Sequence, residues 1–108
     1  MSTKESTVNY ILEQISQAGA VRAKKMFGEY CIYCDDKVVA LVCDNELFVK
    51  LTKAGEAYLG EYELKPAYPG AKPSFHISGD KWDDAEWLTQ LITISSAELP
   101  KPKPKKKR

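Results

Sequence analysis

The length, composition and charge of the chain indicate one globular domain. It has 108 residues, of which 44% are hydrophobic and 29% charged, a balance that excludes a disordered or fibrous chain. No apolar run approaches the ~18–20 residues of a membrane span, and the N-terminal sequence MSTKESTVNY lacks the apolar core of a signal peptide. Three cysteines, an odd number, argue against a secreted disulfide scaffold. We therefore expect a cytoplasmic protein that does not contact a membrane.

The basic residues are concentrated at the C-terminus. Six of the 16 basic residues lie in the final sequence KPKPKKKR, whereas residues 1–100 hold the other 10 together with all 15 acidic residues, a net charge of −5. Alternating prolines favour an extended chain, and like charges repel one another. We predict a folded domain over residues 1–99 and a disordered basic tail over residues 100–108.

Apolar residues near the N-terminus recur at the spacing of one buried helix face. The stripe consists of Val8, Ile11, Leu12, Ile15 and Ala18. Ser2 with Glu5 offers a capping box at the start of this helix, and Gly19 is a typical stop at its end.

The middle of the chain is rich in strand-forming residues. Three apolar or alternating runs cover residues 30–34, 38–43 and 47–51. Two pairs of turn-forming residues separate them, Asp35-Asp36 and Asp44-Asn45. Runs of this kind joined by tight turns predict a three-stranded antiparallel meander.

The pattern of residues 52–99 predicts two helices that flank two strands. Thr52 caps a short helix ending at Gly60, and Asp83 with Glu86 caps the last helix. Strands are expected over residues 63–65 and 74–78. The order helix, three strands, helix, two strands, helix predicts the α+β class, as a two-layer sandwich with an antiparallel sheet and helices on one face.

The sequence offers no recognisable catalytic motif, and we expect a protein that is not an enzyme. His76 is the only histidine, and we expect it to point away from its strand neighbours Phe75 and Ile77 as a satisfied or surface residue. The acidic residues near Asp83 suit a helix N-terminus. An uncatalogued site between Tyr68, His76 and this acidic helix start is the enzymatic alternative.

The C-x-x-C formed by Cys31 and Cys34 raises the question of a metal or redox site. Residues three apart on a strand point to opposite faces, so the two thiols cannot close on one ion without a bulge. Cys43 and His76 could complete a Cys₃His set, but the meander places Cys43 about 20 Å from Cys34 along the sheet. We favour buried small apolar residues. A metal- or ligand-binding module using Cys31, Cys34, Cys43 and His76 is the alternative function.

The basic tail is the clearest interaction feature. Its cations could neutralise a few nucleic-acid phosphates and give weak, salt-sensitive and sequence-independent DNA binding, while a merely solubilising end is the competing interpretation. The six residues are Lys101, Lys103, Lys105, Lys106, Lys107 and Arg108.

Two further segments are candidates for partner binding. The first holds Met26, Phe27, Gly28 and Tyr30, where we favour core packing over an exposed docking surface. The second is the loop with Tyr68, Pro69, Gly70 and Lys72, where we favour a cover over one end of the sheet. The first strand or residues 74–78 are expected at a sheet edge, and an exposed edge leaves a homodimer open.

Several motifs together resemble one known family. They are KMFGEYCIY at residues 25–33, DDKVVALV at 35–42 and DNELFVK at 44–50, followed by YPGAKP at 68–73 and Asp83-Asp84 before the last helix. This combination resembles the N-terminal domain of the TfoX/Sxy family over roughly residues 7–95. The chain departs from the family at Asp36 and Cys31, where glycine is common, so the C-x-x-C looks incidental to the family function.

The resemblance implies both a fold and a role. The implied fold is a two-layer sandwich of order α-β(3)-α-β(2)-α. TfoX/Sxy proteins are positive regulators of natural competence, are thought to co-activate promoters with the cyclic-AMP receptor protein, are not enzymes and carry no known cofactor. Full-length regulators have a second, C-terminal domain, so we expect a stand-alone version of the first. Our leading hypothesis is a regulatory adaptor that binds a transcription factor of the cyclic-AMP receptor type through its folded body.

Overall fold

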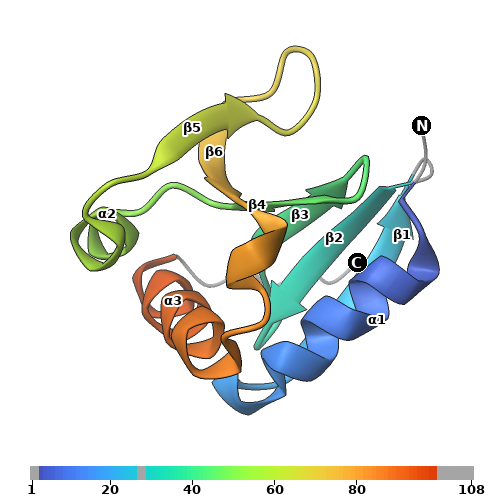
Figure 1. Cartoon of the computed structure of the whole chain (residues 1–108), viewed down its shortest axis with the longest axis horizontal. Helices are drawn as coiled ribbons and strands as arrows, with labels where there is room; N and C mark the ends of the chain where they lie inside the picture. Colours follow the sequence, from blue (N-terminus) through green and yellow to red (C-terminus); the bar gives the residue numbers. More distant parts are fainter. Residues whose placement is uncertain (1–2, 27–28, 100–108) are drawn as a thin grey trace, which may run out of the picture.

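The computed structural model describes residues 3–26 and 29–99 as one curved antiparallel sheet with helices packed on it (Figure 1). The helices are α1 (Glu5–Gln14), α2 (Lys53–Leu59) and α3 (Ala85–Glu98), with short 3₁₀ turns at Ser16–Ala18 and Gly79–Lys81. The strands are β1 (Val21–Met26), β2 (Glu29–Cys34), β3 (Lys37–Cys43), β4 (Glu46–Val49), β5 (Glu63–Pro66) and β6 (Pro73–Ile77). The strand order is β1-β2-β3-β4-β6-β5. The predicted α+β class is confirmed, and the predicted order of helices and strands matches the structure except for one additional strand.

The sheet contains one strand more than either the residue patterns or the family order predicted. The additional strand is β1, which pairs with β2 along its whole length. Its sequence VRAKKM has few strand-favouring residues; among residues 21–25, Val21 and Ala23 pack against the core. Arg22, Lys24 and Lys25 are exposed, as is common on an edge strand whose charges discourage pairing with other chains.

Both predicted tight turns are confirmed. Asp35 and Asp36 have φ angles of 52° and 70°, and Asp44 and Asn45 have φ angles of 53° and 61°. Two consecutive residues with positive φ form the type I′ turn, whose twist matches that of antiparallel strands. Aspartate and asparagine tolerate this conformation better than most residues.

The predicted helix caps are correct at one helix and wrong at two. Thr52 caps α2, since its hydroxyl accepts a hydrogen bond from the Gly55 amide at 3.0 Å. The N-cap of α3 is Asp84 and not Asp83, because Asp84 accepts from the Trp87 amide. The N-cap of α1 is Lys4 and not Ser2, and it has no side-chain cap of its own.

A side chain from a distant turn replaces the missing cap of α1. The Asn45 side-chain oxygen accepts from the Lys4 amide at 2.9 Å and from the Thr7 hydroxyl at 3.1 Å. The Thr3 hydroxyl donates a hydrogen bond to the Glu29 carboxylate and accepts one from the backbone amide of Asn45. Tertiary contacts therefore satisfy polar groups that local sequence rules assign to the helix itself.

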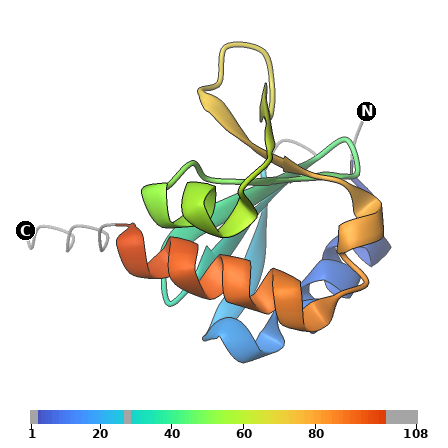
Figure 2. The same ribbon diagram turned by 60° about the vertical axis from the view of Figure 1, so that its left-hand side comes forward.

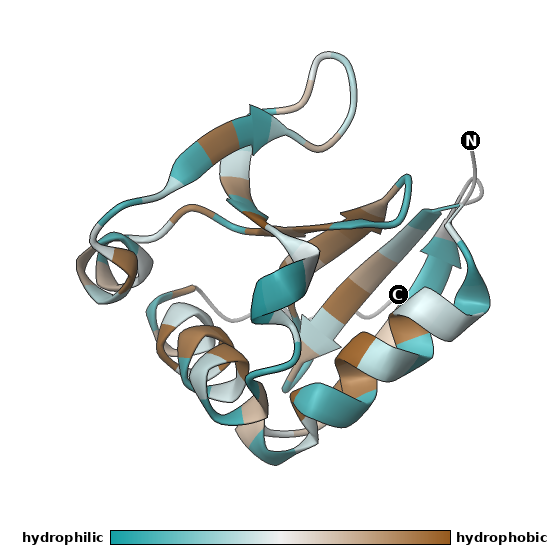
Figure 3. Ribbon diagram, in the orientation of Figure 1, coloured by the Kyte–Doolittle hydropathy of each residue, from teal (hydrophilic) through white to brown (hydrophobic). Residues whose placement is uncertain are grey.

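Alternation along the strands divides the sheet into two faces. The inner face meets the helices and supplies Ile32, Cys34, Ala40, Val42, Leu47, Val49, Phe75 and Ile77 to the core. The helices contribute Val8, Ile11, Ile15, Leu88, Leu91 and Ile92, and their apolar surfaces turn toward the sheet (Figure 3).

Helices α2 and α3 lie side by side (Figure 2) and are joined by a hydrogen bond from the Tyr58 hydroxyl to the Trp87 carbonyl. On the outer face, Arg22 stacks over the Tyr33 ring at 4.2 Å.

Helix α2 approaches the sheet closely enough to require a glycine. A Cβ atom on Gly55 would lie 2.7 Å from Cε2 of Phe75 and 2.8 Å from the Thr52 hydroxyl. Phe75 is fully buried, so its ring cannot move aside without disturbing the core.

Replacing Gly55 tests this contact. We expect Gly55→Ala to lower the free energy of unfolding by about 1–3 kcal/mol through overpacking, although alanine has a helix propensity about 1 kcal/mol better than that of glycine. Urea denaturation followed by circular dichroism measures the change. Gly79→Ala is the matched control, because a Cβ there meets no atom within 4 Å. Equal stability of the two variants would contradict the proposed contact.

Candidate functional site

The hairpin of β5 and β6 projects from the body of the protein (Figure 1). All four residues of β5 are exposed. Among the described residues, five large hydrophobic side chains are exposed, and three of them belong to this hairpin and its approach: Tyr62, Leu64 and Tyr68, at 43%, 40% and 56%. The prediction that the Tyr68 loop covers one end of the sheet is therefore wrong. The loop carries its aromatic residue out into solvent.

The tip of the hairpin is a type II turn that presents Tyr68. The Ala71 amide donates to the Tyr68 carbonyl at 3.0 Å, and Gly70 has a φ angle of 88°. A proline at the second turn position and a glycine with positive φ at the third are the residues that this turn requires. The sequence Tyr68-Pro69-Gly70-Ala71 thus holds an exposed aromatic side chain on a rigid support. Lys72 is exposed beside it.

The base of the hairpin is anchored in the core. Phe75 on β6 is buried and faces Val49 across the sheet. The Tyr62 ring packs edge-on against Phe75, with centroids 5.1 Å apart and an interplanar angle of 77°. The hairpin therefore combines a fixed base with an exposed tip, which is the arrangement expected of a binding loop on a rigid scaffold.

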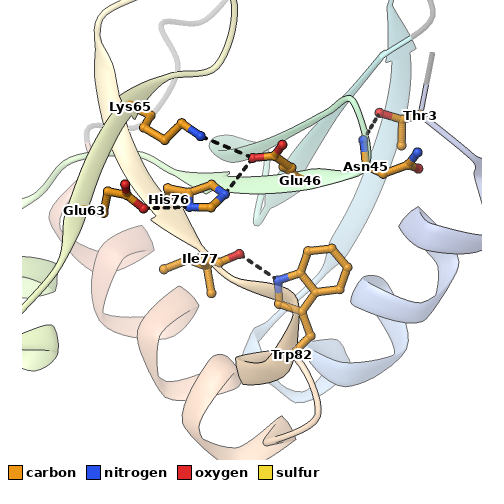
Figure 4. A network of polar contacts seen from close by, with 8 residues as sticks. All are labelled: Thr3, Asn45, Glu46, Glu63, Lys65, His76, Ile77 and Trp82. Atoms are coloured by element: carbon orange, nitrogen blue, oxygen red, sulfur yellow. Dashed lines mark hydrogen bonds and ion pairs between the residues drawn. The ribbon is translucent and has the colours of Figure 1, made fainter. Parts of the chain in front are cut away.

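A polar network on the outer face joins the three strands β4, β6 and β5 (Figure 4). The Nε2 atom of His76 lies 2.7 Å from a Glu46 carboxylate oxygen, and its Nδ1 atom lies 3.2 Å from Glu63. The Lys65 ammonium lies 3.7 Å from the same Glu46 oxygen. His76 faces away from Phe75 and Ile77, as predicted, and its side chain is 17% exposed.

The surroundings of His76 indicate a structural role. Both ring nitrogens face carboxylate oxygens, which only accept hydrogen bonds, so a doubly protonated ring can donate to both at once. The residues of the enzymatic alternative have other contacts. Tyr68 accepts a hydrogen bond in the turn at the hairpin tip, Asp84 caps α3, and Asp83 accepts a hydrogen bond from Tyr10 on α1. The carboxylates that contact the His76 ring are instead those of Glu46 and Glu63.

The three cysteines do not form a metal site. Cys34 belongs to the core on the inner face, whereas Cys31 and Cys43 lie on the outer face, opposite Leu41 and Glu46. Within residues 3–26 and 29–99, no three histidine, cysteine or acidic side chains are placed to hold a metal ion. The proposed set of Cys31, Cys34, Cys43 and His76 is therefore split between two faces, as the strand argument predicted.

Burial disfavours the thiolate form of all three cysteines. They are free and buried, and loss of hydration raises the pKa of each. The largest effect is at Cys43, where burial, followed by the negative charge of Glu29, raises the pKa to about 11. A reactive cysteine needs the opposite shift. The prediction that the three cysteines are buried small residues is confirmed by their burial.

The other predicted binding residues fall in different surroundings. Tyr30 is half-buried and packs against the core. Met26 ends β1, while Phe27, Gly28 and the six basic tail residues lie outside the described residues, so their binding roles stay predictions. Sequence reasoning missed the exposed Leu64, although the alternation of Glu63, Leu64 and Lys65 indicates an apolar side chain between two charged ones.

No helix within the described part of the chain is long and apolar enough to cross a membrane.

Two comparisons with known proteins show what this chain resembles in sequence. The family model of the TfoX N-terminal domain matches residues 13–99. The chain is also similar to an uncharacterized 12.7 kDa protein in the trpE 5′ region of Spirochaeta aurantia. The two are 37% identical over 106 residues, which cover 98% of this chain and 91% of the relative.

Thiol labelling tests the raised pKa values. A pKa of about 11 in place of 9.0 lowers the thiolate fraction of Cys43 about 100-fold at pH 8. We expect iodoacetamide to modify Cys43 at least that much more slowly in the native protein than in urea, as measured by mass spectrometry. Because the folded state keeps the Cys43 proton to a higher pH than the unfolded chain does, the free energy of unfolding should fall as the pH rises from 9 toward 11. Equal labelling rates in the folded and unfolded chain would refute both expectations.

Proposed function

The chain belongs to the TfoX N-terminal domain family, and on that basis we propose that it is a regulatory adaptor that acts through protein partners in transcription regulation. The partner class is a transcription factor of the cyclic-AMP receptor type, which is the class implied by the family role in competence. The adaptor is not an enzyme and works without a cofactor.

The exposed Tyr68 on its type II turn is the observation that carries this proposal. At 56% it is the most exposed large hydrophobic side chain among the described residues. Tyrosine is enriched at the energetic centres of protein interfaces, because it buries a large area and loses little conformational entropy. The turn adds to this by holding the residue in place before a partner arrives.

The charge distribution supports a division of labour between the body and the tail. Residues 1–100 carry a net charge of −5, which disfavours direct contact between the body and DNA phosphates. The six tail cations attract DNA without reading its sequence. The body then supplies the specific protein contact, and the tail raises the local concentration of the adaptor near promoter DNA.

Two features of the site support a function without catalysis. Both ring nitrogens of His76 are occupied by carboxylates, so the ring is not free to serve as a general base. Burial raises the pKa of all three thiols, which lowers the fraction of nucleophilic thiolate at neutral pH.

Two variants separate the contributions of the body and the tail. The Tyr68→Ala variant should bind the cyclic-AMP receptor protein at least about tenfold more weakly, because an interface centre is lost.

A chain ending at residue 100 should lose direct DNA affinity. The affinity of the full chain should fall by up to about 10³-fold between 50 and 200 mM salt. Fluorescence anisotropy with labelled duplex DNA, with and without the receptor protein, measures both.

Matched controls identify the surface responsible. Tyr10→Ala removes another exposed tyrosine, 37% exposed and located on α1, and should leave receptor binding unchanged. DNA binding that survives the truncation with sequence preference intact would refute the division of labour. Receptor binding that is unaffected by Tyr68→Ala would refute the docking role of the hairpin tip.

A further inference from the structure

The sheet has two edge strands, and they differ in chemistry. The strand order places β1 at one edge and β5 at the other. This corrects the expectation of an edge at the first predicted strand or at residues 74–78, because β2 lies between β1 and β3 and β6 lies between β4 and β5. An edge strand presents unpaired backbone groups to any chain that can align with it. All four residues of β5 are exposed, so neither face of this strand is covered.

The charges of β1 oppose pairing with a second copy. A two-fold antiparallel pair centred on Ala23 would place Arg22 against Lys24 of the second copy. Registers centred on Arg22, Lys24 or Lys25 would place that residue against itself. Like charges directly opposite each other destabilise a strand pair, so this edge is protected against self-association.

The side chains of β5 show the opposite pattern. A two-fold antiparallel pair centred on Leu64 sets Glu63 opposite Lys65 of the second copy, and this contact occurs twice. Both side chains lie on the outer face, since Glu63 contacts His76 and Lys65 contacts Glu46. The exposed Leu64 meets its own copy on the other face, so charge and hydrophobicity are both self-complementary.

The backbone of β5 is also suited to this register. Pro66 pairs with Pro73 across the hairpin, and neither residue has an N–H, so this pair cannot exchange hydrogen bonds. Hydrogen-bonded and non-bonded pairs alternate in an antiparallel ladder. The amide and carbonyl of Leu64 therefore point outward from the sheet. A pair centred on Leu64 closes hydrogen bonds between the two Leu64 residues and from each Tyr62 amide to the Pro66 carbonyl of the other copy.

We propose that the partner of the β5 edge is a second copy of this chain, joined in a two-fold antiparallel β5–β5 pair centred on Leu64. The two sheets then form one continuous sheet across the dimer. Lys65 of the second copy adds a positive charge beside Glu63, within a cluster that already holds the carboxylates of Glu46 and Glu63. This surface is distinct from Tyr68 at the hairpin tip.

Charge reversals at two positions provide a test that depends on the register. Lys65→Glu places a carboxylate opposite Glu63 of the second copy, and Glu63→Lys places an ammonium group opposite Lys65. Each single variant should dimerise at least about tenfold more weakly than the unchanged chain. An equimolar mixture of the two variants should restore dimerisation, because every cross-strand pair is then of opposite charge. Sedimentation equilibrium of the full chain and of the mixture measures these affinities.

Controls separate this proposal from a loss of folding and from the adaptor function. Lys24→Glu on β1 should leave the dimer intact, and thermal unfolding of each single variant checks that it still folds. Tyr68→Ala should remain dimeric even where it loses the receptor protein, so the two proposals fail independently. A full chain that stays monomeric up to about 1 mM would overturn the proposal. A mixture of folded variants that associates no better than either alone would overturn it as well.

Discussion

The contact between the Phe75 ring and Gly55 is the constraint on which much of this structure depends. Phe75 is fully buried, pairs with Val49 in the sheet and packs against the Tyr62 ring. Because position 55 has no side chain, α2 can settle directly on that ring. One aromatic side chain thus joins α2, the central sheet and the base of the projecting hairpin.

The hairpin suits the proposed binding role because its two ends differ in their attachment. Its base is held by Phe75 on the inner face and by the His76 network on the outer face. Its tip carries Tyr68 on a turn that needs no further support. A rigid base lowers the entropy lost on binding, while the exposed tip and edge keep apolar and backbone groups available to partners. The two edge strands differ in their charges. Those of β1 would repel the same strand of a second copy, whereas those of β5 complement it in the proposed pair.

Local chemistry explains which elements could be predicted. The type I′ turns follow from Asp35-Asp36 and Asp44-Asn45, and the α2 cap follows from Thr52, because both depend on residues adjacent in sequence. The opposite directions of Cys31 and Cys34 follow from the period of a strand. Strand β1 was missed because its lysines and arginine resemble a polar loop, and only pairing with β2 makes it a strand. The cap of α1 was misplaced because Asn45, about 40 residues away in the chain, supplies it.

The α+β class, the order of all elements except β1, the separation of the thiols and the resemblance to the TfoX N-terminal domain follow from the amino-acid sequence alone. All of these depend on periodicity, turn chemistry or motif spacing, which are local properties. Three features required the folded structure: β5 and β1 are the edges, Glu46 and Glu63 meet at His76, and Tyr68 projects into solvent. These features depend on which strands become neighbours. That choice is made by burial of the whole core, with Phe75 between the sheet and α2, and not by any single segment.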